Sequence, residues 1–206
     1  MKVSVSVLKE YDNLEVAIDK VNKSSANYLH IDVMDGIFVN NSKFPLDICE
    51  KAIKLSNKET DVHLMVNDVE TIKEYANLKP NRLTFHVEVI KNNEIIKYVK
   101  SLGIKVGLAI NPETNINELM PYVNDIDLVL FMSVNPGLGG QKFINSVTDK
   151  IKLFKKLSPK ELDISIDGGV NNETINSCRE AGCNIVVAGS YVTNMDNYDD
   201  AIVNLT

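Results

Sequence analysis

The chain has 206 residues, of which 44% are hydrophobic and 24% charged, and these values are ordinary for a globular protein. This length suits a single α/β barrel, which commonly spans about 200–250 residues, so one core can form without a second domain. The formal net charge of -6 argues against a nucleic-acid or anionic-membrane partner, because either would select a basic surface.

Eight strand-like runs follow one another along the chain, separated by amphipathic helical stretches. In order, the runs read VSVSVL, YLHIDVM, DVHLMV, RLTFHVE, KVGLAI, LVLFMSV, DISIDGG and NIVVAGS. The helical stretches cover residues 14–25, 46–55, 69–78, 93–102, 116–123, 146–157, 173–181 and 198–205.

Regular alternation of strand and helix predicts parallel strands joined by right-handed crossovers. Eight such units predict a closed (β/α)8 barrel, that is, a TIM barrel. No linker, low-complexity tract or charge block divides the chain, so we expect residues 1–206 to form a single domain. The alternative is an open doubly wound sheet, but the first strand lacks the GxGxxG turn of dinucleotide-binding folds.

The strand YLHIDVM places polar and apolar residues on opposite faces. Successive strand side chains alternate, so His30, Asp32 and Met34 share one face, while Leu29, Ile31 and Val33 share the other. In a barrel the apolar face packs on the surrounding helices and the polar face points to the axis. The first, third, fourth and seventh strands show the same alternation, which predicts polar side chains converging at the barrel centre.

Four of these inward residues have the chemistry of a metal site. His30, Asp32, His63 and Asp167 offer two imidazoles and two carboxylates, which suit one divalent cation such as Zn, Fe(II), Mn or Co. The alternative is that they are buried polar residues that satisfy one another. His86 and Glu88 also have inward parity, and we interpret them as supporting residues beside the site.

Glycine-rich turns follow the last three strands. The segments are NPGLGGQKF, DGG and AGS, and the backbone N–H groups of such turns bind phosphate without a basic side chain. The alternative is that these glycines only make tight turns. Three methionines are expected on the inward face near strand ends: Met34, Met65 and Met132. They either fill core space or form an apolar lining that keeps water away from the site.

The three cysteines, Cys49, Cys178 and Cys183, have no zinc-site spacing. Their odd number and the early polar residues of the chain, which do not resemble an export signal, indicate reduced thiols. We therefore expect a cytoplasmic protein.

Several motifs occur in the order seen in ribulose-phosphate 3-epimerases, and nearly the whole chain resembles this family. They are HIDVMDGIFVNN, DVHLMV, TFHVE, VGLAINPET, MSVNPGLGGQKF, IDGGVNNETI and AGSYV. The resemblance implies a barrel of the ribulose-phosphate binding type, an isomerase of the pentose phosphate pathway. Such an enzyme interconverts D-ribulose 5-phosphate and D-xylulose 5-phosphate with one divalent cation per chain. It also implies a sugar-phosphate partner and a homo-oligomer, either a dimer or a hexamer.

The resemblance assigns roles to individual residues. The metal ligands are His30, Asp32, His63 and Asp167, and the two aspartates are also the acid/base pair of an enediolate mechanism. Substrate and phosphate contacts fall on Ser6, His63, Gly137, Leu138, Gly139, Gly140, Asp167, Gly168, Gly169, Gly189 and Ser190, with Met34, Met65 and Met132 lining the site. The chain departs from the family pattern at Ile37 and Asn40. It also departs at SVSVLKE, where the first strand of the family usually ends in PSIL followed by small polar residues.

Three other functions fit parts of this pattern. An epimerase of a hexulose phosphate such as D-allulose 6-phosphate is the nearest, although its close relatives tend to break the DGG that this chain keeps. A phosphate-binding barrel lyase or decarboxylase would share the glycine turns but would not need His30 and His63 together. A non-catalytic metal-binding or scaffold protein would not require both a phosphate site and paired aspartates.

Overall fold

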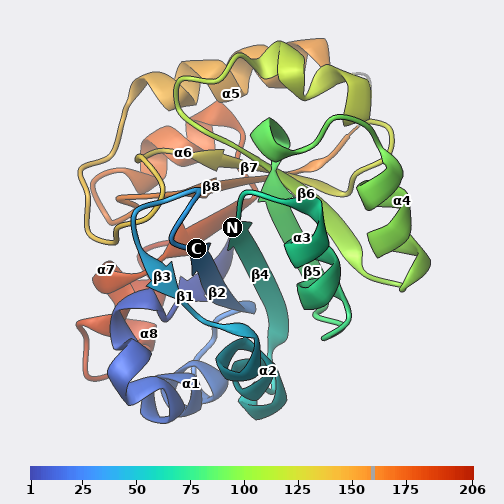
Figure 1. The fold of residues 1–206 in the computed structure, drawn as a ribbon. Coiled ribbons are helices and arrows are strands. Elements are labelled where there is room, and N and C mark those ends of the chain that lie inside the picture. The colour runs from blue at the N-terminus through green and yellow to red at the C-terminus, as the bar shows by residue number, and fades with distance from the viewer. Residues whose placement is uncertain (159–160) are drawn as a thin grey trace.

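The computed structural model describes residues 1–158 and 161–206. Over these residues, eight parallel strands close into a barrel through the pairing of the first strand with the second, and Figure 1 shows helices around them. The barrel strands are β1 (Lys2–Ser6), β2 (Tyr28–Asp35), β4 (Glu59–Met65), β5 (Arg82–His86), β6 (Lys105–Ile110), β7 (Leu128–Met132), β8 (Asp163–Asp167) and β9 (Ile185–Ala188). All eight predicted strands are confirmed, and the closed barrel excludes the open sheet.

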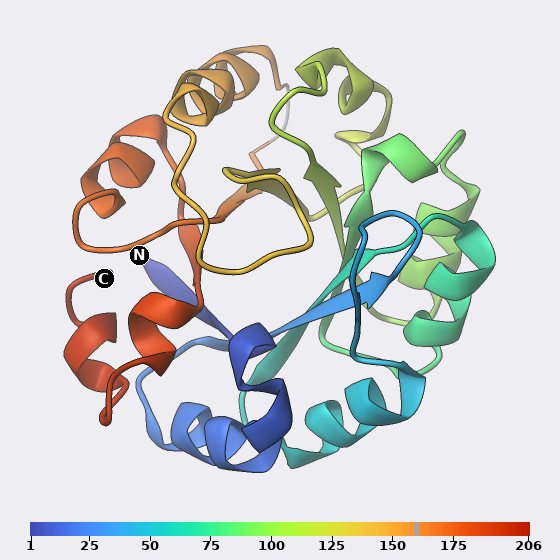
Figure 2. The same ribbon diagram turned by 60° about the vertical axis from the view of Figure 1, so that its left-hand side comes forward.

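The α-helices lie on the outside of the barrel, as the turned view in Figure 2 shows. They are α1 (Leu14–Lys23), α2 (Leu46–Leu55), α3 (Val69–Ala76), α4 (Glu94–Ser101), α5 (Ser146–Leu157), α6 (Ile175–Ala181), α7 (Ser190–Thr193) and α8 (Asp199–Ile202). Seven of the eight predicted helical stretches contain one of these helices. None of the helices in the described ranges is both long and apolar enough to cross a membrane.

The predicted helix at residues 116–123 is wrong in kind. This stretch forms two separate 3-10 turns, η3 (Ile116–Glu118) and η4 (Met120–Tyr122). Pro121 explains the difference, because proline has no backbone N–H to donate to the carbonyl four residues earlier, and its ring clashes with that carbonyl. The spacing of the hydrophobic residues is that of an α-helix, but the α-helical backbone hydrogen bonds cannot continue through Pro121.

Short elements at the carboxyl ends of the strands lay outside the sequence prediction. They are η1 (Leu8–Asn13), η2 (Val87–Val89), α7, and β3 (Ser42–Lys43), which pairs antiparallel with the end of β2. Each is too short to display a hydrophobic period, so alternation of apolar and polar residues cannot reveal it.

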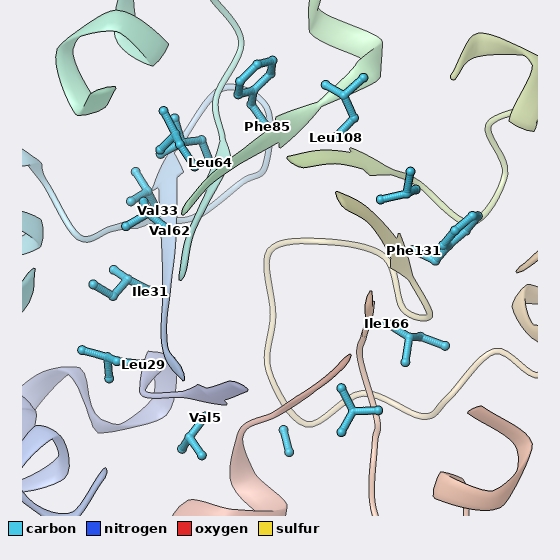
Figure 3. Close-up of a cluster of buried hydrophobic side chains, with 14 of the residues drawn as sticks. Val5, Leu29, Ile31, Val33, Val62, Leu64, Phe85, Leu108, Phe131 and Ile166 are labelled. Carbon is cyan, nitrogen blue, oxygen red and sulfur yellow. The ribbon is translucent and has the colours of Figure 1, made fainter. Parts of the chain in front are cut away.

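Two cores lie on the two faces of the barrel strands. Outward side chains such as Ile31, Leu64 and Phe131 are fully buried against the helices, and Figure 3 shows them radiating away from the barrel. On β7 and α5, the rings of Phe131 and Phe154 meet edge-on with centroids 5.5 Å apart. Inside the barrel, a smaller apolar cluster that includes Leu130 fills one part of the axis, and polar side chains occupy the rest. The predicted alternation is confirmed, and it directs the polar face inward.

Candidate functional site

Four side chains from three strands converge inside the barrel. His30 and Asp32 come from β2, His63 from β4 and Asp167 from the carboxyl end of β8. One ligand atom from each lies within 4.8 Å of the others. The two imidazoles are completely buried and the Asp32 carboxylate almost so, whereas the Asp167 side chain is 18% exposed. The group can therefore hold one small cation with Asp167 as its open side.

Hydrogen bonds orient the imidazole of His30. Its Nδ1 lies 3.0 Å from Oδ2 of Asp61, which also accepts a 3.0 Å hydrogen bond from the hydroxyl of Ser4. Its Nε2 is 3.2 Å from Oδ1 of Asp32, yet it has no hydrogen bond within the described structure, because the ring N–H direction does not meet that oxygen. A proton on Nδ1 thus leaves the Nε2 lone pair facing the site.

The charge around His30 favours a cation. Burial would lower the pKa of this imidazole, but the carboxylates of Asp32 and Asp61 raise it well above its ordinary value. The carboxylates stabilise a positive charge at this position, which either a proton or a metal ion supplies. The buried, unpartnered nitrogen and the surrounding negative charge both fit a metal ligand.

His63 is held from the opposite side by a chain of two further residues. Its Nδ1 lies 3.1 Å from Asp32 and 4.0 Å from Asp167, and its Nε2 lies 3.0 Å from Nε2 of His86. Nδ1 of His86 lies 3.2 Å from Oε2 of Glu88. Burial lowers the pKa of His86 to about 4, so its single ring proton points to Glu88 and its Nε2 accepts from His63. This network assigns the Nδ1 lone pair of His63 to the site.

The two carboxylates have different protonation preferences. Burial would raise the pKa of Asp32, but the positive charge on His30 lowers it well below the ordinary range, and the hydroxyl of Ser6 donates a 2.7 Å hydrogen bond to Oδ2. Burial and the negative charge of Asp32 raise the pKa of Asp167 to about 6. Two carboxyl groups whose environments separate their pKa values are a common arrangement for acid and base roles.

A cavity of about 300 Å³ opens above this group at the carboxyl ends of the strands. Met34, Met65 and Met132 line it, and each is at most 3% exposed. The three lie beside the polar group because strand register pairs Met34 with Met65 and Met132 with Asp167. The methionines give the cavity an apolar wall next to its charged floor.

Glycine turns form the other side of the cavity. The segments after β7, β8 and β9 contribute Gly137 to Gly140, Gly168, Gly169 and Gly189 to its lining, together with Leu138 and Ser190. In the described part of the chain, the backbone N–H groups of Gly139, Gly140 and Gly169 donate no hydrogen bond. Gly169 has φ +64°, and a Cβ there would lie 2.7 Å from the backbone N of Phe143, so only glycine fits.

The structure brings nearly all of the sequence-predicted site residues to one place. Ser6, Asp32, Asp167, the three methionines and the glycine segments all line the cavity, while His30 and His63 lie behind its wall. His86 and Glu88 support His63, as described above. Two neighbours, Asp61 behind His30 and Lys9 at the rim, had no predicted role in the site. Asp61 could have been found from its position on the inward face of its strand, which it shares with His63. Lys9 could have been found as a charged residue directly after the first strand, where the family pattern has small polar residues.

The sequence is similar over nearly its whole length to a known family. A family model described as the ribulose-phosphate 3 epimerase family matches residues 2–193. Ribulose-phosphate 3-epimerase from Bacillus subtilis (strain 168) is 39% identical over 209 residues, covering 98% of this chain and 96% of that protein. Ribulose-phosphate 3-epimerase from Methanocaldococcus jannaschii is 34% identical over 211 residues, covering 100% of this chain and 89% of that protein.

Solved structures with the same fold have little sequence in common with the chain. KGPDC from Streptococcus mutans superimposes with a TM-score of 0.73 at 12% identity, covering 99% of this chain and 94% of that one. A 3-hexulose-6-phosphate synthase superimposes with a TM-score of 0.69 at 15% identity, covering 100% and 98%. At this identity the likeness establishes the barrel architecture and nothing about chemistry.

Proposed function

The chain belongs to the ribulose-phosphate 3-epimerase family, and from this premise we propose that its cavity interconverts D-ribulose 5-phosphate and D-xylulose 5-phosphate. The reaction inverts the carbon next to a ketone, so a proton must leave one face of that carbon and another must arrive on the opposite face. The observation that carries the proposal is the convergence of two imidazoles and two carboxylates within 4.8 Å, with the carboxylates lining a cavity that has glycine turns at its rim and the imidazoles directly behind them.

We infer that one divalent cation of the Zn, Fe(II), Mn or Co group binds per chain. His30 through Nε2, His63 through Nδ1 and one oxygen each of Asp32 and Asp167 would hold it, a nitrogen and oxygen donor set that suits these ions. When bound, such a cation polarises the ketone oxygen and stabilises the negative charge of the deprotonated sugar.

Asp32 and Asp167 are the proposed proton carriers. Their strands, β2 and β8, are separated in the barrel by β1 and β9, so the two carboxylates reach the cavity from different directions. One aspartate takes the proton from the carbon next to the ketone, and the other gives a proton to the opposite face of the planar enediolate. Their roles exchange in the reverse reaction. Ser6 supports this by holding Oδ2 of Asp32 and leaving its other oxygen toward the site.

The remaining lining residues suit a phosphorylated sugar. Unpaired N–H groups at Gly139, Gly140 and Gly169 are donors for phosphate oxygens, and the turn at Gly189 and Ser190 borders the same space. The three methionines exclude water from the side of the cavity where the enediolate would form. The phosphate would thus be bound at the rim, while the reacting carbon lies above the carboxylates.

Metal analysis combined with assays on defined substrates tests the proposal. The purified protein is assayed with D-ribulose 5-phosphate and with D-allulose 6-phosphate, before and after chelation and after reloading with each divalent cation. We expect about one ion per chain, epimerisation of the pentulose phosphate in preference to the hexulose phosphate, loss on chelation and recovery on reloading. Full activity of a protein shown to be metal-free contradicts the metal assignment, and preference for the hexulose phosphate contradicts the substrate assignment.

A further inference from the structure

Lys9 stands at the rim of the cavity, where the sequence departs from the small polar residues of the family pattern. It belongs to η1, the 3-10 segment that follows β1 and packs against α7. We propose that the Lys9 ammonium binds the phosphate group of the substrate directly, so that this cavity recognises the anion with a charged side chain as well as with backbone groups. This inference rests on the proposed function and specifies which residue carries part of its phosphate recognition.

The side chain of Lys9 lies along the glycine turn after β7. A Cβ built on Gly140 would lie 2.6 Å from Nζ of Lys9, and one built on Gly139 would lie 3.3 Å from its Cε. The ammonium is therefore next to the backbone N–H groups of Gly139 and Gly140, which donate no hydrogen bond in the described structure. In Figure 2 the yellow-gold loop that follows β7 crosses the barrel opening and approaches the dark-blue η1 segment.

No carboxylate of the described chain lies within 4 Å of the Lys9 ammonium, so it is available to a ligand. Among the described residues that line the cavity, Lys9 carries the one basic side chain, whereas Asp32 and Asp167 are both acidic. A phosphate group carries a charge of about -1.5 to -2 near pH 7. The ammonium thus offsets repulsion between that charge and the carboxylates at the floor.

The exposure of Lys9 sets the size of the effect. Its side chain is exposed at the rim, so water and salt screen its charge, and the contact contributes less than a buried one. A hydrogen bond to a charged group in such a place corresponds to about a tenfold change in affinity. We expect this change in the binding of phosphate and not in the chemical step, because the ammonium lies at the rim and not beside the reacting carbon.

The competing explanation is that Lys9 only covers the glycine turn with its methylene stem while its ammonium stays in water. Three variants separate the two explanations. Lys9→Met keeps the stem and removes the charge, Lys9→Arg keeps the charge, and Lys97→Met removes an exposed lysine of α4 that does not line the cavity. Each metal-loaded protein is measured for kcat, for KM at low and high salt, for inhibition by inorganic phosphate, and for Tm.

We expect Lys9→Met to raise KM and the inhibition constant of inorganic phosphate about tenfold at low salt, with kcat within about twofold and Tm unchanged. High salt should narrow the difference in KM, and Lys9→Arg and Lys97→Met should resemble the parent. If Lys9→Met changes KM and phosphate inhibition no more than Lys97→Met does, the inference is overturned. If Tm falls in Lys9→Met while phosphate inhibition is unchanged, the role is structural and the inference is likewise overturned.

The two proposals can fail separately. A parent protein that epimerises neither ketose phosphate contradicts the proposed function. Direct titration of that protein with inorganic phosphate still tests Lys9, because weaker binding in Lys9→Met than in Lys97→Met supports the ammonium contact without any catalysis. Equal binding in these two variants overturns it.

Discussion

Nδ1 of His30 lies 3.0 Å from Oδ2 of Asp61, a carboxylate that is only 3% exposed. This contact sits on the far side of the imidazole from Asp32 and the cavity. A carboxylate behind a ligating histidine fixes its tautomer and raises the basicity of the other ring nitrogen. Asp61 therefore acts on the proposed metal site without touching the metal.

We predict that Asp61→Asn weakens divalent cation binding about 10–100-fold, because the amide still accepts from His30 but no longer supplies negative charge. Competition titration with a chelator measures the change. Asp163→Asn is the matched control, since Asp61 and Asp163 both lie 3.8 Å from the buried Arg82 but only Asp61 contacts His30. Equal cation affinity in the two variants would contradict the role given to Asp61.

Glu88 is predicted to link the site to acid stability. Burial would raise its pKa, but hydrogen bonds from His86, Thr114 and the backbone of Asn111 lower it to about 2. Because the folded pKa lies below the ordinary value of 4.5, ionised Glu88 stabilises the fold fully above about pH 4.5. That contribution is lost as the pH falls toward about 2.

Glu88→Gln should therefore lower the free energy of unfolding by about 1–3 kcal/mol at pH 7, and the difference from the parent should shrink below about pH 4.5. Urea unfolding of the variant and the parent between pH 7 and pH 3.5 measures the difference in the free energy of unfolding and its dependence on pH. Glu113→Gln is the control and should differ little from the parent, because Glu113 lies in the loop after β6 that Glu88 contacts but is exposed and has no side-chain partner in the described structure. A pH-independent loss in Glu88→Gln would show that its charge is not the cause.

The positions of the site residues were predictable where the strand period alone decides them. Alternation of faces predicted that His30, Asp32, His63 and Asp167 point inward, and each does. The alternation of faces says which side chains point inward, but not which inward side chains of neighbouring strands touch. The contact of Asp61 with His30, outside the cavity, was therefore not predictable from the sequence.

Segments without a period were beyond prediction for a different reason. The η1 segment that carries Lys9 is held by its contact with neighbouring elements, including α7, and local sequence contains no signal for that contact. At residues 116–123 the prediction failed for the opposite reason, because a helical period is present where no continuous α-helix forms. The hydrophobic spacing is helical, but Pro121 limits the segment to two 3-10 turns.

Gly189 and Gly169 should respond differently to the same substitution. At Gly189, φ is -99° and an added Cβ would meet Ser6 atoms only at 3.7–3.8 Å, which is ordinary contact. The Cβ of Gly189→Ala should therefore meet no steric clash within the chain, and the variant should raise KM about tenfold, because the methyl group takes space next to the bound phosphate. Gly169→Ala should lose about 1–3 kcal/mol of stability, because its φ of +64° disfavours any side chain and the Cβ meets a backbone atom.

Thermal unfolding and steady-state kinetics on both variants check this pair. An unchanged KM in a stable Gly189→Ala protein would mean that the phosphate binds elsewhere. A Gly169→Ala protein as stable as the parent would contradict the strain assigned to that turn.

The two carboxylates of the site should serve opposite faces of the substrate. Asn at position 32 or 167 keeps the size of the side chain and one oxygen but removes the base, and loss of a general acid or base typically costs about 10²–10⁴ in rate. Since both residues are also proposed ligands, the metal content of Asp32→Asn and Asp167→Asn must be measured first. In a variant that keeps its metal, epimerisation should collapse in both directions, because each turnover uses both faces.

The remaining aspartate in each variant should still remove and return a proton on its own side. One epimer should then exchange its C3 hydrogen with deuterated water without inverting, while the other should not exchange, and mass spectrometry of the recovered sugar phosphates measures both. Asp32→Asn and Asp167→Asn should label opposite epimers, because they retain opposite bases. If a metal-loaded Asp167→Asn protein epimerises at near the parent rate, or if both variants label the same epimer, Asp32 and Asp167 do not act as the two opposed bases.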